Sequence, residues 1–224
     1  MRAHVLIVLA GCLLAPLTIA AAQKDSVTHP ANRLGWIVPA GIAASAVLDP
    51  EAREWALRGH TRSLDRVARS VNPLGTTRLL VPAMAITYVG ALVTDRQSLA
   101  VGTLNTAVGY IAADLLESSL KAIAGRERPH VEGNSHRFRP FTANGDWHSF
   151  PSAHVAHIAS IAAAISEQTH SAPISGLSDI LVTLVGLDRI YEDQHWASDV
   201  TATIVLSSAV SRATVRWLES RQRR

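Results

Sequence analysis

The sequence predicts an all-α protein, a single-domain bundle of about six helices with the functional residues at the helix ends. Three observations lead to this class. Long runs rich in alanine, leucine and valine recur along the 224 residues, and short polar or Gly/Pro-containing stretches separate them. Alternating patterns typical of β-strands are scarce, and no internal repeat divides the chain. A hydrophobic content of 48% is sufficient for the core of one domain.

The first 22 residues have the pattern of a secretory signal peptide. The apolar segment Val5–Ile19 is followed by three alanines, 20–22, which form a small-residue cleavage site. A lipoprotein signal ending at Cys12 is the competing interpretation, but it leaves an apolar stretch after the cut. We therefore expect cleavage after residue 22, export to the periplasm or cell envelope of a bacterium, and one folded domain over residues 23–224.

Composition narrows the classes of function. Cys12 is the only cysteine, so a chain cleaved after residue 22 has neither disulfides nor thiol chemistry. The net charge is +3, and basic residues concentrate in Arg126–Arg139 and Arg216–Arg224. Aromatic residues do not interleave with these charges, so we expect no nucleic-acid binding. The expected partner is an anionic small molecule or a membrane surface; the oligomeric state stays open.

The apolar pattern gives the expected helices. An amphipathic helix is predicted over Glu51–Val71, ended by Asn72-Pro73-Leu74-Gly75. Leu34–Leu48 is apolar but short for a membrane span. Ser98 is expected to cap one of the later helices. These later helices are predicted over Leu79–Val93, Leu99–Leu120, Ser152–Ser166, Leu177–Leu187 and Trp196–Leu218.

Several of these runs approach the length of a membrane span. They also carry ionisable residues, namely Asp114, Glu117, His157 and Asp179. Charged groups inside lipid are costly. The sequence therefore favours a globular bundle associated with the membrane, with an integral six-helix form as the alternative.

A long loop joins two of the predicted helices and carries candidate site residues. Gly125–Pro151 is rich in Gly, Pro, Asn and Asp, and loops of this length inside a domain are usually functional. Lys121 lies just before it, where pairing with Glu117 on the same helix is the simplest alternative role. Arg128 precedes a proline, which favours an extended backbone and leaves the guanidinium free to bind an anion.

The segment after this loop predicts an anion-binding helix start. Pro151 suits the first position of a helix, where Ser152 and Ala153 would present unpaired backbone N–H groups. Such a helix start can hold a phosphate. His154 would lie in the first turn and face the same anion. The alternative is that a serine only caps this helix and that His154 is a surface histidine.

The third candidate segment contains a histidine and an aspartate four residues apart. On a helix beginning near His195, His195 and Asp199 share one face, so the carboxylate would fix the tautomer of the imidazole. Arg189 adds a third cation. Three cations, a helix N-terminus and two histidines are what phosphoryl transfer requires.

The order and spacing of these residues resemble the type 2 phosphatidic acid phosphatase family, which includes class A acid phosphatases and vanadium haloperoxidases. The resemblance rests on three motifs: Lys121-x6-Arg128-Pro129, Pro151-Ser152-Ala153-His154 and Arg189-x5-His195-x3-Asp199. It implies a phosphatase that needs no metal or cofactor and forms a covalent phosphohistidine on a phosphorylated small molecule or lipid. It implies His195 as nucleophile, Asp199 as the residue that orients it and His154 as general acid. The implied phosphate ligands are Lys121, Arg128, Ser152, Ala153 and Arg189.

Two residues depart from the family pattern. Ala153 stands where glycine is usual, and its methyl group would crowd a bound anion. Asp188 stands where serine is usual, and its carboxylate can pair with Arg189 and weaken the hold of Arg189 on phosphate.

Three other interpretations remain open from the sequence. His154 and His157, with the loop histidines, could be imagined around zinc, but neither an HExxH motif nor a cysteine pair supports a metal site. Vanadate bound to His195 would make a haloperoxidase. A decayed site would leave an envelope protein that binds anionic lipid without turnover.

Overall fold

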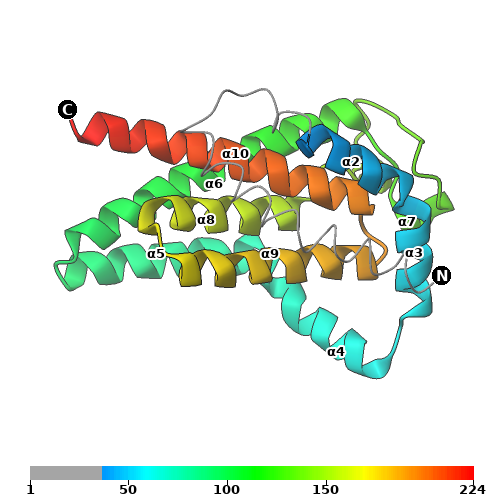
Figure 1. The fold of residues 1–224 in the computed structure, drawn as a ribbon, viewed down its shortest axis with the longest axis horizontal. Helices are drawn as coiled ribbons and strands as arrows, with labels where there is room; N and C mark the ends of the chain where they lie inside the picture. Colours follow the sequence, from blue (N-terminus) through cyan, green and yellow to red (C-terminus); the bar gives the residue numbers. More distant parts are fainter. Residues whose placement is uncertain (1–36) are drawn as a thin grey trace.

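A computed structural model describes residues 37–224, and the predicted signal peptide lies outside these residues. The described part is helical throughout (Figure 1). Its α-helices are α2 Ile37–Val47, α3 Asp49–Arg58, α4 Arg62–Val71, α5 Thr77–Val93, α6 Gln97–Ala124, α7 Pro129–Glu132, α8 Ala153–Thr169, α9 Ala172–Tyr191 and α10 Ala197–Gln222. Two 3-10 helices join them, η2 Asn72–Gly75 and η3 Gly145–Trp147.

The all-α prediction is confirmed, but the number of about six helices is wrong, because residues 37–224 alone form nine α-helices. The predicted helix over Glu51–Val71 is two helices that meet at Gly59–Thr61. Thr61 caps the second one, since its hydroxyl accepts a hydrogen bond from the Leu64 amide at 3.2 Å. The predicted cap at Ser98 is also wrong, because α6 begins one residue earlier, at Gln97.

The long helices α5, α6, α8, α9 and α10 run along the long axis of the molecule (Figure 1). Helices α8 and α10 pack on each other and on α6, while α9 covers α8 and α5 covers α6. Small side chains permit this close packing: a Cβ atom added at Gly109 of α6 would come within 2.6 Å of the Ser211 hydroxyl of α10. The core lies mainly between α8, α9 and α10, around Val155, Val185 and Val200.

Helices α3, α4 and α7 gather at one end of the bundle (Figure 1). Helix α6 finishes at this end, α8 and α10 start there, and α9 finishes there. The end of the bundle therefore combines two helix N-termini with two C-terminal turns that carry basic residues, Lys121 and Arg189.

The outer surface of the bundle carries many exposed apolar side chains. On α5, Ile86 and Val93 are 73% and 81% exposed, and on α6 Leu115 is 63% exposed. Among residues 37–224, α6 is the one helix that by itself is long and apolar enough to cross a membrane; α4, η2 and α5 pass the same test as a pair bent by 53°. Apolar surface of this extent is typical of contact with a membrane or another protein.

Candidate active site

The structure places every predicted site residue at the same end of the bundle. Lys121 lies in the last turn of α6, Arg128 caps α7, and Arg189 lies in the last turn of α9. Their positive charges reach both histidines, since all three lower the pKa of His154 and of His195. Arg128 has the extended backbone expected before a proline, with φ −72° and ψ 148°. The three motifs of the sequence thus form one basic cluster around two imidazoles.

His195 is buried, and a main-chain oxygen holds its ring. The Nδ1 atom lies 2.5 Å from the carbonyl oxygen of Ser149. A carbonyl oxygen only accepts hydrogen bonds, so Nδ1 carries the proton and Nε2 keeps its lone pair. Burial, followed by the positive charge of Arg128, holds the pKa of His195 well below its ordinary value. A neutral imidazole with a free Nε2 lone pair has the protonation state that a nucleophile needs.

Asp199 does not contact His195 among the hydrogen bonds of the described residues, in contrast to the predicted direct contact. Helix α10 begins at Ala197, so His195 precedes the helix and the two residues do not share a helical face. Instead, Asp199 accepts hydrogen bonds from the Ser149 hydroxyl at 2.5 Å and from the Trp196 amide at 3.1 Å. Asp199 therefore reaches the imidazole through Ser149.

Arg126 is a third partner of Asp199, and sequence reasoning missed it. Its Nη1 atom lies 2.5 Å from Asp199 Oδ1, and its Nη2 atom lies 2.7 Å from Asp49 Oδ2. Burial raises the pKa of Asp199, and the charge of Arg126 opposes that increase. Arg126 stands inside the first motif, two residues before Arg128, so its position was a usable signal. Nothing in the sequence pointed to Asp49.

Two of the three cationic candidate phosphate ligands are paired with carboxylates of the same chain. Lys121 forms an ion pair with Glu117 one turn earlier, as its alternative role predicted. Arg189 donates from Nε and Nη2 to the same oxygen of Asp188, and the Nε distance is 2.9 Å. Burial raises the pKa of Asp188, and the charge of Arg189 partly offsets this. An incoming phosphate therefore competes with these carboxylates for its cations.

Arg128 is held by neutral oxygens. It donates from Nε to the Gly145 carbonyl at 2.9 Å and from Nη1 to the Gln194 side chain at 2.8 Å. These contacts join the long loop to the segment before His195. They leave the charge of Arg128 without a carboxylate partner within ion-pair distance among residues 37–224.

The start of α8 differs in one detail from the predicted phosphate site. The Ser152 amide is not free, because it donates to the Thr203 hydroxyl at 3.0 Å. The Ser152 hydroxyl is buried and has no hydrogen-bond partner among residues 37–224. The amides of Ala153 and His154 begin the helix and have no intrahelical acceptor. One hydroxyl and two amides are thus available to a phosphate oxygen.

His154 is half-buried and packs against Gly75 of η2. A Cβ atom added at Gly75 would lie 2.7 Å from the Cβ atom of His154, so only glycine fits there. Burial, helped by the charges of Arg189, His157 and Lys121, lowers the pKa of His154 to about 4. A bound phosphate dianion opposes these charges and therefore raises that pKa. Sequence reasoning treated Gly75 only as part of a helix stop.

His157, one turn further along α8, has a structural role. Its Nδ1 atom lies 3.0 Å from the Gly75 carbonyl, and its Nε2 atom lies 2.9 Å from Asp114. It thereby fixes η2 against α6 and α8. Residues 37–224 contain no group of three or more His, Cys, Asp or Glu side chains placed to hold a metal ion.

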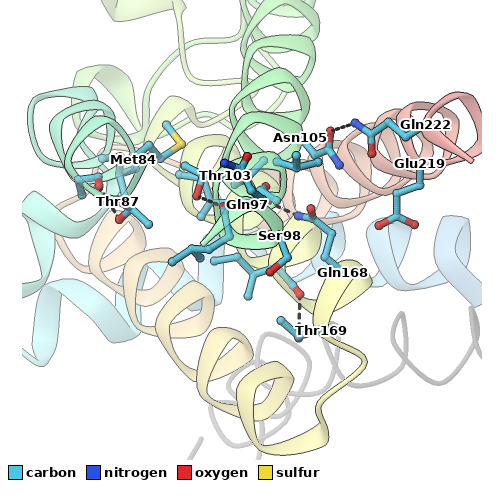
Figure 2. Close-up of a pocket in the computed structure, with 18 residues that line it drawn as sticks. Met84, Thr87, Gln97, Ser98, Thr103, Asn105, Gln168, Thr169, Glu219 and Gln222 are labelled. Atoms are coloured by element: carbon cyan, nitrogen blue, oxygen red, sulfur yellow. Dashed lines mark hydrogen bonds between the residues drawn. The ribbon is translucent and has the colours of Figure 1, made fainter. Parts of the chain in front are cut away.

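A pocket of ≈ 850 Å³ occurs elsewhere in the bundle. It lies between α5, the first turns of α6 and the ends of α8 and α10, and none of the predicted site residues lines it. Figure 2 shows its polar rim, where Gln168 donates to Thr106 at 3.0 Å and Gln222 donates to Asn105 at 3.1 Å. Lys121 stands 15 residues beyond Thr106 on α6, roughly 22 Å along the helix axis. The basic cluster, and not this pocket, is the candidate active site.

An all-helical bundle with three cations, a helix N-terminus and two histidines at one end is the arrangement that a phosphatase requires. The chain belongs to the PAP2 superfamily, whose family model matches residues 102–223. The predicted resemblance to the type 2 phosphatidic acid phosphatase family is thereby confirmed. No curated protein sequence matches the chain significantly.

Two solved structures share the fold. LpxE from Aquifex aeolicus has a TM-score of 0.60 and 19% sequence identity, and the match covers 75% of this chain and 95% of that chain. The first transmembrane PAP2-type phosphatidylglycerolphosphate phosphatase from Bacillus subtilis has a TM-score of 0.56 and 17% identity, with coverage of 93% and 97%. These likenesses show that the fold is that of PAP2-type phosphatases.

Proposed function

We propose that the chain is an exported, metal-independent phosphatase that transfers the phosphoryl group of a phosphate ester to His195. The observation that carries the proposal is the state of this ring. Its Nδ1 proton is tied to the Ser149 carbonyl, which leaves the Nε2 lone pair free among three cations. Cations at this position stabilise the charge that develops on the phosphoryl oxygens.

The reaction has two balanced steps. In the first, the Nε2 lone pair of His195 forms a bond to phosphorus while the bond from phosphorus to the ester oxygen breaks, and protonated His154 gives its proton to the leaving oxygen. In the second, neutral His154 takes a proton from water, the hydroxide oxygen bonds to phosphorus, and the N–P bond breaks. Inorganic phosphate leaves, and both histidines return to their initial state.

The expected phosphate ligands are the cations and the start of α8. Arg128, Arg189 and Lys121 neutralise the non-bridging oxygens, and the Ser152 hydroxyl and Ala153 amide donate hydrogen bonds. Phosphate binding would replace the Asp188 and Glu117 carboxylates as the partners of Arg189 and Lys121.

A lipid phosphate is the substrate class that the surface favours. Exposed apolar side chains along the bundle, such as Ile86, Val93 and Leu115, suit contact with the acyl chains of a membrane. The structurally similar Bacillus subtilis protein is a phosphatidylglycerolphosphate phosphatase, so its substrate is a lipid phosphate. Together with the predicted signal peptide, this surface leads us to propose that the chain acts at the outer face of the bacterial inner membrane.

Phosphate release tests the proposal. Purified protein is incubated with excess chelator and either phosphatidic acid in detergent or a soluble aryl phosphate, beside His195→Ala and the control His136→Ala in the exposed loop. We expect chelator-resistant release that His195→Ala lowers by on the order of 10³-fold or more and that His136→Ala leaves unchanged. Release lost to the chelator, or retained in His195→Ala, would contradict the histidine mechanism. Faster release from the aryl phosphate would contradict the lipid preference.

A further inference from the structure

Asp49, the first residue of α3, lies in none of the three motifs, yet its carboxylate has three hydrogen-bond donors around it. Its side chain is fully buried. Oδ1 accepts a hydrogen bond from the Ser198 amide at 2.9 Å, and Oδ2 accepts one from the Ser198 hydroxyl at 2.7 Å. Ser198 lies in the first turn of α10, whose amides have no intrahelical acceptor. Asp49 therefore caps α10 from a distant part of the chain.

The same carboxylate holds Arg126. Oδ2 of Asp49 lies 2.7 Å from Arg126 Nη2, and Arg126 Nη1 contacts both the Ser198 hydroxyl at 2.8 Å and Asp199 at 2.5 Å. The Nε atom of Arg126 donates to the Ser135 carbonyl at 3.0 Å. Four of the five N–H donors of this guanidinium are thus used by protein oxygens, and the side chain is buried, so Arg126 serves the protein network and not the substrate.

The contacts continue to the nucleophile. Asp199 accepts from the Ser149 hydroxyl, the Ser149 amide donates to the Arg126 carbonyl at 3.0 Å, and the Ser149 carbonyl accepts from His195 Nδ1. Ser149, whose carbonyl sets the tautomer of His195, is therefore held at its hydroxyl by Asp199 and at its amide by the carbonyl of Arg126. Both of these residues depend on Asp49, either directly or through Arg126.

We propose that Asp49 is a positioning residue for His195, acting through Arg126, Asp199 and Ser149. The proposal rests on the phosphatase function proposed above. It extends the site to α3, which precedes the family match at residues 102–223. Asp49 and Asp199 together carry two negative charges against the single positive charge of Arg126, so the group remains net negative beside the Nδ1 proton. This charge stabilises the positive imidazole that forms as Nε2 bonds to phosphorus.

A purely structural role for Asp49 predicts a different result. Helix α3 has a second polar tie to the site end of the bundle, because Arg53 forms an ion pair with Asp193 at 2.8 Å. If α3 only needs to be docked, loss of either tie has the same effect. If Asp49 positions the nucleophile, only its loss slows the chemical step.

The test compares Asp49→Asn with Arg53→Gln in the full chain. Asparagine keeps the shape of the side chain and removes its charge. We expect kcat of Asp49→Asn to fall at least about 10-fold, the inhibition constant of inorganic phosphate to stay within about threefold, and Arg53→Gln to resemble the parent protein. Equal losses in both variants, or a parent-like kcat in folded Asp49→Asn, would overturn the proposal.

Two further measurements test the proposal if Asp49→Asn does not fold or if the protein shows no turnover. Ser198→Ala removes the hydroxyl shared by Asp49 and Arg126 and leaves both charges, so it tests the network if Asp49→Asn does not fold. We expect its kcat to fall several-fold at an unchanged phosphate inhibition constant, and a parent-like kcat would overturn the proposal. Nitrogen-15 NMR of His195 needs no turnover: the parent should show Nδ1 protonated, and Asp49→Asn a mixture of tautomers. If Asp49→Asn shows the same single tautomer as the parent, the positioning role of Asp49 is refuted. If the spectra change as expected but the parent protein shows no turnover, only the proposed phosphatase function is refuted.

Discussion

Removing the charge of Asp188 should tighten phosphate binding. Asp188→Asn keeps the shape of the side chain but no longer offers Arg189 a charged oxygen. Charge-assisted hydrogen bonds contribute about 1.5–3 kcal/mol and neutral ones about 0.5–1.5 kcal/mol. The free energy with which residue 188 competes against phosphate for Arg189 should therefore decrease by about 1–2 kcal/mol. Its two donors to Asp188 then become available to the ligand. We expect the inhibition constant of inorganic phosphate to fall by about 5- to 30-fold.

The assay is inhibition of ester hydrolysis by inorganic phosphate, combined with thermal melting. Without phosphate, Asp188→Asn should melt at a lower temperature, because the buried charge of Arg189 loses its partner. Added phosphate should then raise its melting temperature more than that of the parent protein. Because burial raises the pKa of Asp188, acid pH neutralises the parent carboxylate too, so the two proteins should converge as pH falls.

Glu167→Gln is the matched control, since Glu167 pairs with Arg216 by two hydrogen bonds, at 2.7 and 3.0 Å, away from the site. Its phosphate inhibition should equal that of the parent. An inhibition constant that stays equal or rises in Asp188→Asn, with a normal control, would refute competition between Asp188 and phosphate for Arg189.

Three other outcomes are expected. The proposed proton donor His154 has a pKa of about 4 in the free protein, so kcat/KM should fall as pH rises above about 4. The fall in kcat should occur only at higher pH, because bound phosphate raises that pKa. A kcat/KM that is flat from pH 4 to 7 would contradict the general-acid role. Gly75→Ala should displace His154, lower kcat and reduce the free energy of unfolding by about 1–3 kcal/mol. The control Gly90→Ala should keep full activity, because a Cβ atom there meets nothing within 4 Å. A parent-like kcat and melting temperature in Gly75→Ala would contradict the packing of Gly75 against His154. In the folded protein the pKa values of His154 and His195 lie below the ordinary value of 6.5, so the unfolded chain binds more protons. The free energy of unfolding should therefore decrease as pH falls below about 6.5. A free energy of unfolding that stays constant between pH 7 and 5 in denaturant titrations would contradict buried neutral imidazoles.

The sequence was most informative where chemistry fixes the spacing of residues. Lys121, Arg128, His154 and His195 stand in short motifs whose order could be interpreted as one phosphate site, and the structure brings them to one end of the bundle. Their roles follow from residue type: cations bind anions, and imidazoles exchange protons near neutral pH.

The sequence was least informative where a contact depends on helix register or tertiary packing. The expected contact between His195 and Asp199 assumed a helix start that falls two residues too early. Asp49 could not be found, because its partners lie more than 70 residues away and helical periodicity carries no signal for them. The break between α3 and α4 was missed because apolar spacing continues across Gly59 while the backbone does not.

The acceptor that fixes the tautomer of His195 has an evolutionary consequence, because it belongs to the main chain. A side-chain acceptor can be deleted by one substitution, whereas the carbonyl of Ser149 is present whatever residue occupies position 149. Mutation can only shift this carbonyl through its neighbours. While this hydrogen bond is intact Nδ1 is blocked, so any covalent adduct on this ring in the parent protein should be a single regioisomer, attached at Nε2.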